Sequence, residues 1–321
     1  ADPSDAEAAM ALEQSVSEGA SATAVATAFQ EAAASITGES DDDNEAKKSM
    51  LFRAARTFDG PGKDKNKAEE AYAAIFALDP TDEVAAMSLE EVRKQLGKYE
   101  ELIEMLLERS QAAPEGESRA RAMAEIGLIY STELDDADQA LVAYTQALCE
   151  VPTRTHYVHE IERLAEGHQE RWTEALASVT SALQGGALSA ADRATLLSLA
   201  AKWYEEKLGR ADMALLAFQQ VVAAEPSNEA ALEGIGAIYR RAQQWPELLS
   251  VLMQRVEAVP NSPKARDLRV EAAEVLEQRL NDAVRARELY ERVLADDPGH
   301  VKAGDAMARI AEKQGDFTTL V

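Results

Sequence analysis

The feature that most constrains this 321-residue sequence is a fixed spacing between prolines. Pro80, Pro152, Pro226 and Pro298 follow one another at intervals of 72, 74 and 72 residues, and a further proline divides two of these intervals into 34 and 38 residues. A fixed period in this range is typical of stacked supersecondary units, each of which cannot bury its apolar faces alone. We therefore expect one elongated repeat array in place of the two or so globular domains that the length alone suggests.

The stretch Asn228 to Pro260 shows what one unit contains. One helical face carries Leu232, Ile235, Gly236 and Tyr239, and after a polar turn that ends at Trp245 a second face carries Leu248, Leu252 and Val256. Residues 101 to 114, ELIEMLLERSQAAP, repeat residues 247 to 260, ELLSVLMQRVEAVP. The unit is therefore a helical hairpin, and the chain alternates a 34-residue hairpin with a slightly longer one.

The longer hairpins repeat an alanine, an aromatic residue four positions later and a closing proline. The four sets are Ala68, Tyr72 and Pro80; Ala140, Tyr144 and Pro152; Ala214, Phe218 and Pro226; and Ala286, Tyr290 and Pro298, each with Phe58, Tyr130, Tyr204 or Leu276 ten residues before the alanine. In the short hairpin Gly236, Tyr239 and Pro260 keep their places, whereas Leu248 replaces the alanine. This pattern resembles the tetratricopeptide repeat family, whose unit is a 34-residue helix–turn–helix. The resemblance implies an all-α fold, a right-handed superhelical α-solenoid.

We expect a single solenoid over residues 1–321. Its predicted parts are a degenerate N-terminal repeat at 4–37, repeats at 44–80, 81–114, 115–152, 153–187, 188–226, 227–260 and 261–298, and an incomplete ninth repeat at 299–321 in which Phe317 and Leu320 open the second helix. The repeat at 153–187 has extra residues before Trp172 and glycines in place of its proline, which predicts a change of curvature or a mobile joint there.

Two local features have simple structural interpretations. Residues 38–44, GESDDDN, are expected to form a polar loop that caps the next helix, because their spacing lacks the order of a calcium loop. Cys149, the single cysteine, is expected to be a small buried residue.

The formal net charge of -25 bears on the class of partner. Nucleic acids and anionic membranes are bound through Lys and Arg, so we expect neither nucleic-acid binding nor membrane insertion. No stretch of eighteen apolar residues occurs, and a single cysteine forms no internal disulfide. We expect a cytoplasmic protein, with the periplasm left open. The start, ADPSDAEAAM, lacks an initiating Met and the last repeat stops inside its second helix, which suggests a piece of a longer protein.

Residues with catalytic or metal-binding chemistry are sparse. His156 and His159 lie on one helical face, but no third ligand accompanies them at a fitting distance. No phosphate-binding glycine loop and no nucleophile motif occurs. We expect no cofactor, no metal and no enzymatic activity.

By the resemblance, a concave wall lined by the first helix of each hairpin would bind a protein or peptide partner. The candidate groove residues are Arg53, Arg56, Met87, Glu91, Arg121, Glu125, His159, Glu162, Lys202, Glu205, Glu233, Arg240, Glu271 and Glu274. Co-chaperone members of the family hold a terminal carboxylate with Lys and Asn, but Val84, Met87, Ala230 and Ala237 occupy comparable places here, so that clamp is absent. The acidic C-terminal half, with Glu271, Glu274 and Glu277, suits a basic or amphipathic segment.

The sequence therefore favours a non-enzymatic protein–protein interaction scaffold. Two alternatives remain open: a structural strut within a much larger repeat protein of a bacterial envelope or motility assembly, and a regulatory arm of an enzyme encoded outside this segment. The sequence determines neither the partner nor the oligomeric state.

Overall fold

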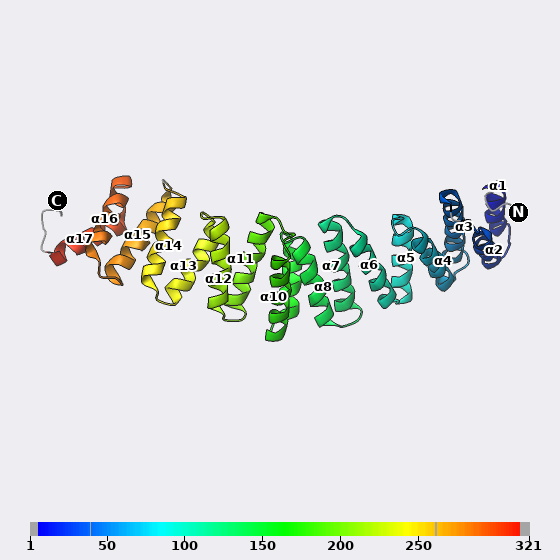
Figure 1. Cartoon of the computed structure of the whole chain (residues 1–321), viewed down its shortest axis with the longest axis horizontal. Helices are drawn as coiled ribbons and strands as arrows, with labels where there is room; N and C mark the ends of the chain where they lie inside the picture. Colours follow the sequence, from blue (N-terminus) through cyan, green and yellow to red (C-terminus); the bar gives the residue numbers. More distant parts are fainter. Residues whose placement is uncertain (1–5, 39, 261, 315–321) are drawn as a thin grey trace. The chain divides into compact units, whose positions relative to one another are not determined.

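The computed structural model describes residues 6–38, 40–260 and 262–314, which form seventeen helices and no strand (Figure 1). The predicted all-α class is confirmed. Phe317 and Leu320, expected to open the second helix of the ninth repeat, lie outside the described residues. No helix of the described part combines the length and the apolar character needed to cross a membrane.

The chain divides into two compact units, Ala1–Glu150 and Val151–Val321. The first holds α1 (Ala6–Ser17), α2 (Ala22–Ser35), α3 (Asp41–Asp59), α4 (Lys65–Leu78), α5 (Glu83–Leu96), α6 (Tyr99–Ala112), α7 (Gly116–Thr132) and α8 (Ala137–Glu150). The second holds α9 (Thr155–Ala165), α10 (Gln169–Gln184), α11 (Ala190–Glu206), α12 (Ala211–Ala224), α13 (Glu229–Arg241), α14 (Trp245–Ala258), α15 (Pro263–Gln278), α16 (Ala283–Asp296) and α17 (Val301–Gln314).

Within each unit every helix packs against the next one along the chain, as a series of helical hairpins requires. The hairpin predicted at 228–260 is present as α13 and α14. The division into nine repeats, the joint in the 153–187 repeat and the superhelical hand of the whole chain stay predictions.

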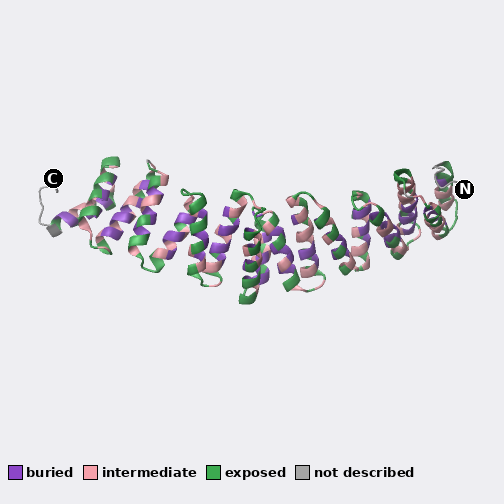
Figure 2. Cartoon of the chain, in the orientation of Figure 1, coloured by how far each residue is buried: buried purple, intermediate pink, exposed green. Residues whose placement is uncertain are grey.

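The residues that define the long hairpin are core residues. Ala68, Ala140, Ala214 and Ala286 are completely buried, and the aromatic residue four positions after each of them is buried as well. Figure 2 shows buried and exposed residues on opposite sides of the helices in both units. A small side chain at the alanine position lets the two helices of a hairpin approach closely, while the aromatic ring fills the space beside it.

Three tyrosines of the repeat pattern and the single cysteine are only partly buried. Tyr239, Tyr130 and Tyr204 are half-buried, and Tyr239 lies in the last turn of α13, where it packs at the edge of the core. Cys149 is also half-buried, near the end of α8, and burial raises the pKa of its thiol to about 11. Cys149 was expected to be buried, but it is less buried than its neighbours Ala147 and Leu148, which are completely buried.

The helix α3 begins at Asp41, inside the polar loop that was predicted at residues 38–44. Ser40 caps α3, and Asp43 completes a capping box by accepting from the backbone of Ser40, so the capping prediction was correct. Asp41 to Asp43 form the first turn of α3 and are not part of a loop. Acidic side chains at this end are stabilised by the partial positive charge of the free backbone N–H groups.

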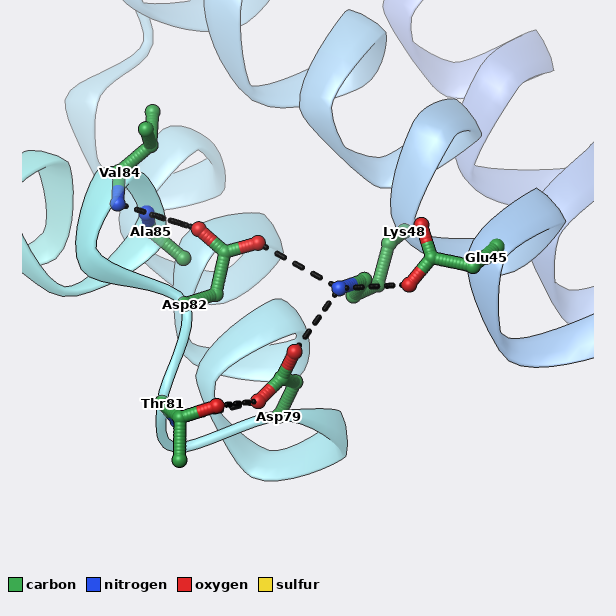
Figure 3. A network of polar contacts seen from close by, with 7 residues as sticks. All are labelled: Glu45, Lys48, Asp79, Thr81, Asp82, Val84 and Ala85. Carbon is green, nitrogen blue, oxygen red and sulfur yellow. Dashed lines mark hydrogen bonds and ion pairs between the residues drawn. The ribbon is translucent and has the colours of Figure 1, made fainter. Parts of the chain in front are cut away.

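Lys48 ties the start of one hairpin to the next in the first unit (Figure 3). Its Nζ lies 2.8 Å from Glu45 Oε1, 2.9 Å from Asp79 Oδ2 and 3.5 Å from Asp82 Oδ2. Asp79 also accepts hydrogen bonds from the hydroxyl and the backbone N–H of Thr81. The bonds from Thr81, together with the bond from Lys48, lower the pKa of Asp79 to about 2. Lys48 therefore connects α3 to both ends of the turn that leads into α5.

Candidate binding groove

Three helices of the second unit, α9, α11 and α13, line an open groove of about 840 Å³. Each is the first helix of a hairpin. We call it the His159–Lys202 groove, and its lining residues are Pro152, Thr153, Thr155, Val158, His159, Glu162, Ala191, Ala194, Thr195, Ser198, Leu199, Lys202, Glu225, Asn228 and Ala230. Three of the fourteen predicted groove residues, His159, Glu162 and Lys202, lie together here.

The amphipathic pattern of the helices explains how these side chains come to face the groove. In α9 the side chains of Tyr157, Ile161 and Leu164 are buried, which leaves His159 and Glu162 on the open side. In α11 Thr195, Ser198 and Lys202 follow at intervals of three and four residues and form a second stripe.

The two carboxylates of this groove are bound by neighbouring groups. Glu162 accepts a hydrogen bond of 3.1 Å from Nε1 of the buried Trp203, and Glu225 accepts one of 2.8 Å from the side chain of Asn228. Lys202 and His159 are exposed. The groove thus presents two fixed acceptors and two exposed nitrogen-bearing side chains above a floor of small residues.

A second, acidic groove of about 500 Å³ lies between α15 and α17. It is lined by Asp267, Val270, Glu271, Glu274, His300, Val301 and Lys302. Glu271 is also paired with Arg240 of α13. Glu277, the third member of the predicted acidic group, does not line this groove and pairs instead with Arg309 at 2.8 Å.

The predicted groove residues of the first unit have other partners or are simply exposed. Arg53 pairs with Glu13 at 2.7 Å, and the guanidinium of Arg56 lies 5.6 Å from the centre of the Phe52 ring. Met87, Glu91 and Arg121 are exposed.

Glu125, the remaining candidate of that unit, belongs to a cluster of ion pairs between α5 and α7. Lys94 lies 2.6 Å from Glu90 and 2.7 Å from Glu125. Burial and the neighbouring Glu125 raise the pKa of Glu90. Burial also opposes ionisation of Glu125, but its hydrogen bonds with Glu90 and Lys94 outweigh burial and lower its pKa. This cluster connects the first helices of two successive hairpins, and its charged groups are paired with one another.

The last three candidates also connect helices. Arg241 lies 2.8 Å from Glu205, Arg255 lies 3.7 Å from Glu233, and Arg240 is paired with Glu271. The pairs Lys94–Glu125 and Arg240–Glu271 both span 31 residues, close to one repeat length, and that offset is the signal by which the sequence could have revealed them.

Sequence reasoning missed Thr195, Ser198 and Asn228, which line the His159–Lys202 groove without charge. The signal for the first two was their regular spacing to Lys202. Although His156 and His159 are on one helix, the described residues contain no cluster of three or more His, Cys, Asp or Glu placed to hold a metal ion.

No protein-family profile matches the chain. Among curated proteins, the human tetratricopeptide repeat protein 34 is 26% identical over 236 residues, a match that covers 66% of this chain and 41% of the relative. This match agrees with the buried alanine and aromatic residues that recur in successive helical hairpins of this chain. By this match the chain is similar to proteins of the tetratricopeptide repeat family.

Solved tetratricopeptide repeat structures are similar at low identity. YrrB, described as having an unusual peptide-binding site, is 19% identical with a TM-score of 0.33, over 58% of this chain and 91% of its own. The C-terminal part of a repeat protein from Cytophaga hutchinsonii is 17% identical with a TM-score of 0.38, over 80% and 99% of the two chains. The yeast Sti1 TPR2AB domain, solved as a complex with pHSP90, is 17% identical with a TM-score of 0.29, over 85% and 98%.

Proposed function

We propose that this tetratricopeptide repeat chain is a non-enzymatic scaffold that binds an extended segment of a protein partner in the His159–Lys202 groove. The observation that carries the proposal is the groove itself, which is lined by three successive first helices and presents the exposed side chains of His159 and Lys202. The curated relative is matched over 41% of its length, so the activity of a longer protein would be a further question.

A preformed wall suits this task because little of the scaffold has to be ordered when the partner binds. Backbone groups of an extended segment can bond to Ser198, while its side chains rest on the small residues Ala191 and Ala194. The acidic groove between α15 and α17 lies in the same unit, and its Asp267, Glu271 and Glu274 would suit basic residues of the same partner.

Selection from a library of random 12-residue displayed peptides, with the intact chain as bait, tests the proposal. Binding of each selected peptide is then measured by fluorescence anisotropy. Thr195→Trp places a large ring in the groove, and Gln219→Trp places the same ring on the exposed side of α12 outside it. We expect Thr195→Trp to weaken binding at least about tenfold and Gln219→Trp to leave it unchanged.

Two outcomes would contradict the proposal. One is that no peptide is enriched by the wild-type chain. The other is that the selected peptides bind Thr195→Trp as tightly as the wild type, which would place their site elsewhere. Thermal unfolding of both variants controls for loss of fold, and both replaced side chains are exposed.

A further inference from the structure

Almost every Lys and Arg side chain of the second unit has an interaction partner within the chain. Among residues 151–312, apart from 261, nearly every Lys and Arg has a carboxylate, a backbone carbonyl or an aromatic ring as its partner. The cations of this part for which the structure shows no partner are Lys202, Arg292 and Lys302. In a chain this acidic, a cation left without an acceptor is an exception that the fold does not explain.

Lys202 differs from Arg292 in its position. It lies in the last turns of α11 and lines the His159–Lys202 groove, whereas Arg292 is exposed on α16 and lines neither groove. The carboxylate of Glu162 is already held by Trp203, and that of Glu225 by Asn228. Lys202 is therefore a charge presented to whatever occupies the groove.

The groove also has a direction. Ala191 and Lys202 mark its extent along α11, and eleven residues of helix correspond to about 16 Å. An extended chain rises about 3.3 Å per residue, so about five residues span this length. Lys202 is at one end and small side chains, Ala191 and Ala194, are toward the other.

We infer that Lys202 selects an acidic side chain at one end of a bound extended segment of about five residues, whose other side chains are mainly apolar. The inference rests on the proposed function and adds the chemistry of the partner. A carboxylate at that end gains a charge-assisted hydrogen-bond partner in the exposed ammonium group of Lys202. Apolar side chains of the segment suit the apolar lining residues Val158, Ala194 and Leu199, and the small Ala191 and Ala194 leave room for them above α11.

The test repeats the 12-residue peptide selection with Lys202→Glu and with Arg292→Glu. Both variants replace an exposed cation that has no partner by an anion, so they change the net charge equally. We expect the wild type and Arg292→Glu to enrich Asp or Glu at one fixed position, and Lys202→Glu to enrich Lys or Arg at that same position.

A matched peptide pair measures the effect. In a selected peptide, Glu→Gln or Asp→Asn at the fixed position keeps the shape and removes the charge. We expect this change to weaken binding about tenfold for the wild type and less than twofold for Lys202→Met. Equal weakening of both proteins would overturn the inference.

The outcomes separate the inference from the function on which it rests. Peptides that are blocked by Thr195→Trp but show the same preferences for the wild type and for Lys202→Glu would overturn the role of Lys202 and leave the groove in use. A wild-type selection without any enriched peptide would overturn both. Equal melting temperatures of the two charge variants show that the comparison concerns binding and not folding.

Discussion

Gly234 of α13 lies directly against the ring of Phe218 of α12. A Cβ atom at position 234 would be 2.5 Å from both Cε2 and Cζ of the ring, closer than real Cβ contacts allow. Gly304 in α17 is the opposite case, because a Cβ there would meet no atom within 4 Å. The absence of a side chain at Gly234 is therefore what lets α13 pack closely on the preceding hairpin.

This contrast predicts opposite effects of one substitution. An alanine in a helix is normally more stable than a glycine by about 0.5–1 kcal/mol, so Gly304→Ala should stabilise the chain. Gly234→Ala should be destabilising by about 1–2 kcal/mol net, because forcing a methyl group against the Phe218 ring costs more than the helix gains. Urea unfolding followed by circular dichroism compares the two variants, and a stabilising Gly234→Ala would contradict the close packing.

Tyr290 and Tyr239 should differ in their contribution to stability. Tyr290 of α16 is completely buried, so Tyr290→Ala should cost about 3–5 kcal/mol, as for other large-to-small changes in a core. Tyr239 is half-buried, and Tyr239→Ala should cost roughly half as much or less. Equal losses in urea unfolding would show that the ring of Tyr239 is covered as fully as that of Tyr290.

The Lys48 network predicts a pH dependence in the first unit. The bonds from Thr81 and Lys48 lower the pKa of Asp79 to about 2 from its ordinary value of 3.8. A carboxyl group with a lowered pKa stabilises the fold fully above the unfolded value, and this contribution is lost as the pH falls from about 4 toward 2. Asp79→Asn should therefore be less stable than the wild type at pH 6, by a margin that narrows below pH 4.

Unfolding of wild type and Asp79→Asn at a series of pH values measures that margin. The difference between the two proteins is the relevant quantity, because other carboxylates change the stability of both. A margin that stayed constant between pH 6 and pH 3 would mean that Asp79 is not held by Lys48 and Thr81 in solution.

The acidic groove gives a prediction about basic partners. Glu274 lines this groove, and Glu288 on α16 is exposed outside it. Glu274→Lys should weaken the binding of peptides that carry Lys or Arg by about tenfold, since it replaces attraction by repulsion at the groove wall. Glu288→Lys is the matched control, and equal effects of the two changes on anisotropy titrations would indicate only a nonspecific response to net charge.

Much of the fold could be predicted because the same core residues recur at the same spacing in several hairpins. Ala214 followed by Phe218 and Pro226 indicates one buried hairpin, and three other copies confirm the interpretation. Exposure near helix ends was harder to predict, as Tyr239 shows, because periodicity gives the face of a residue and not how far its neighbours extend. Asp41 to Asp43 were assigned to a loop because acidic residues occur both in loops and in the first turn of a helix.

The candidate site was predicted less completely. Periodicity indicates that Lys202 and Glu125 are both on first helices, but it does not show that Glu125 already has Lys94 as its partner whereas Lys202 has none. Pairing depends on the distance between side chains of neighbouring repeats, which the pattern of one helix does not contain. Uncharged lining residues such as Ser198 also carry no distinctive signal.

The location of a bound peptide tests the central claim most directly. A selected peptide that carries p-benzoylphenylalanine beside its acidic residue is irradiated with the intact chain, and the crosslinked residues are identified by mass spectrometry. We predict crosslinks to α9 and α11 around His159 and Lys202. Crosslinks confined to α10, α12 or α14, the second helices of these hairpins, would contradict the account.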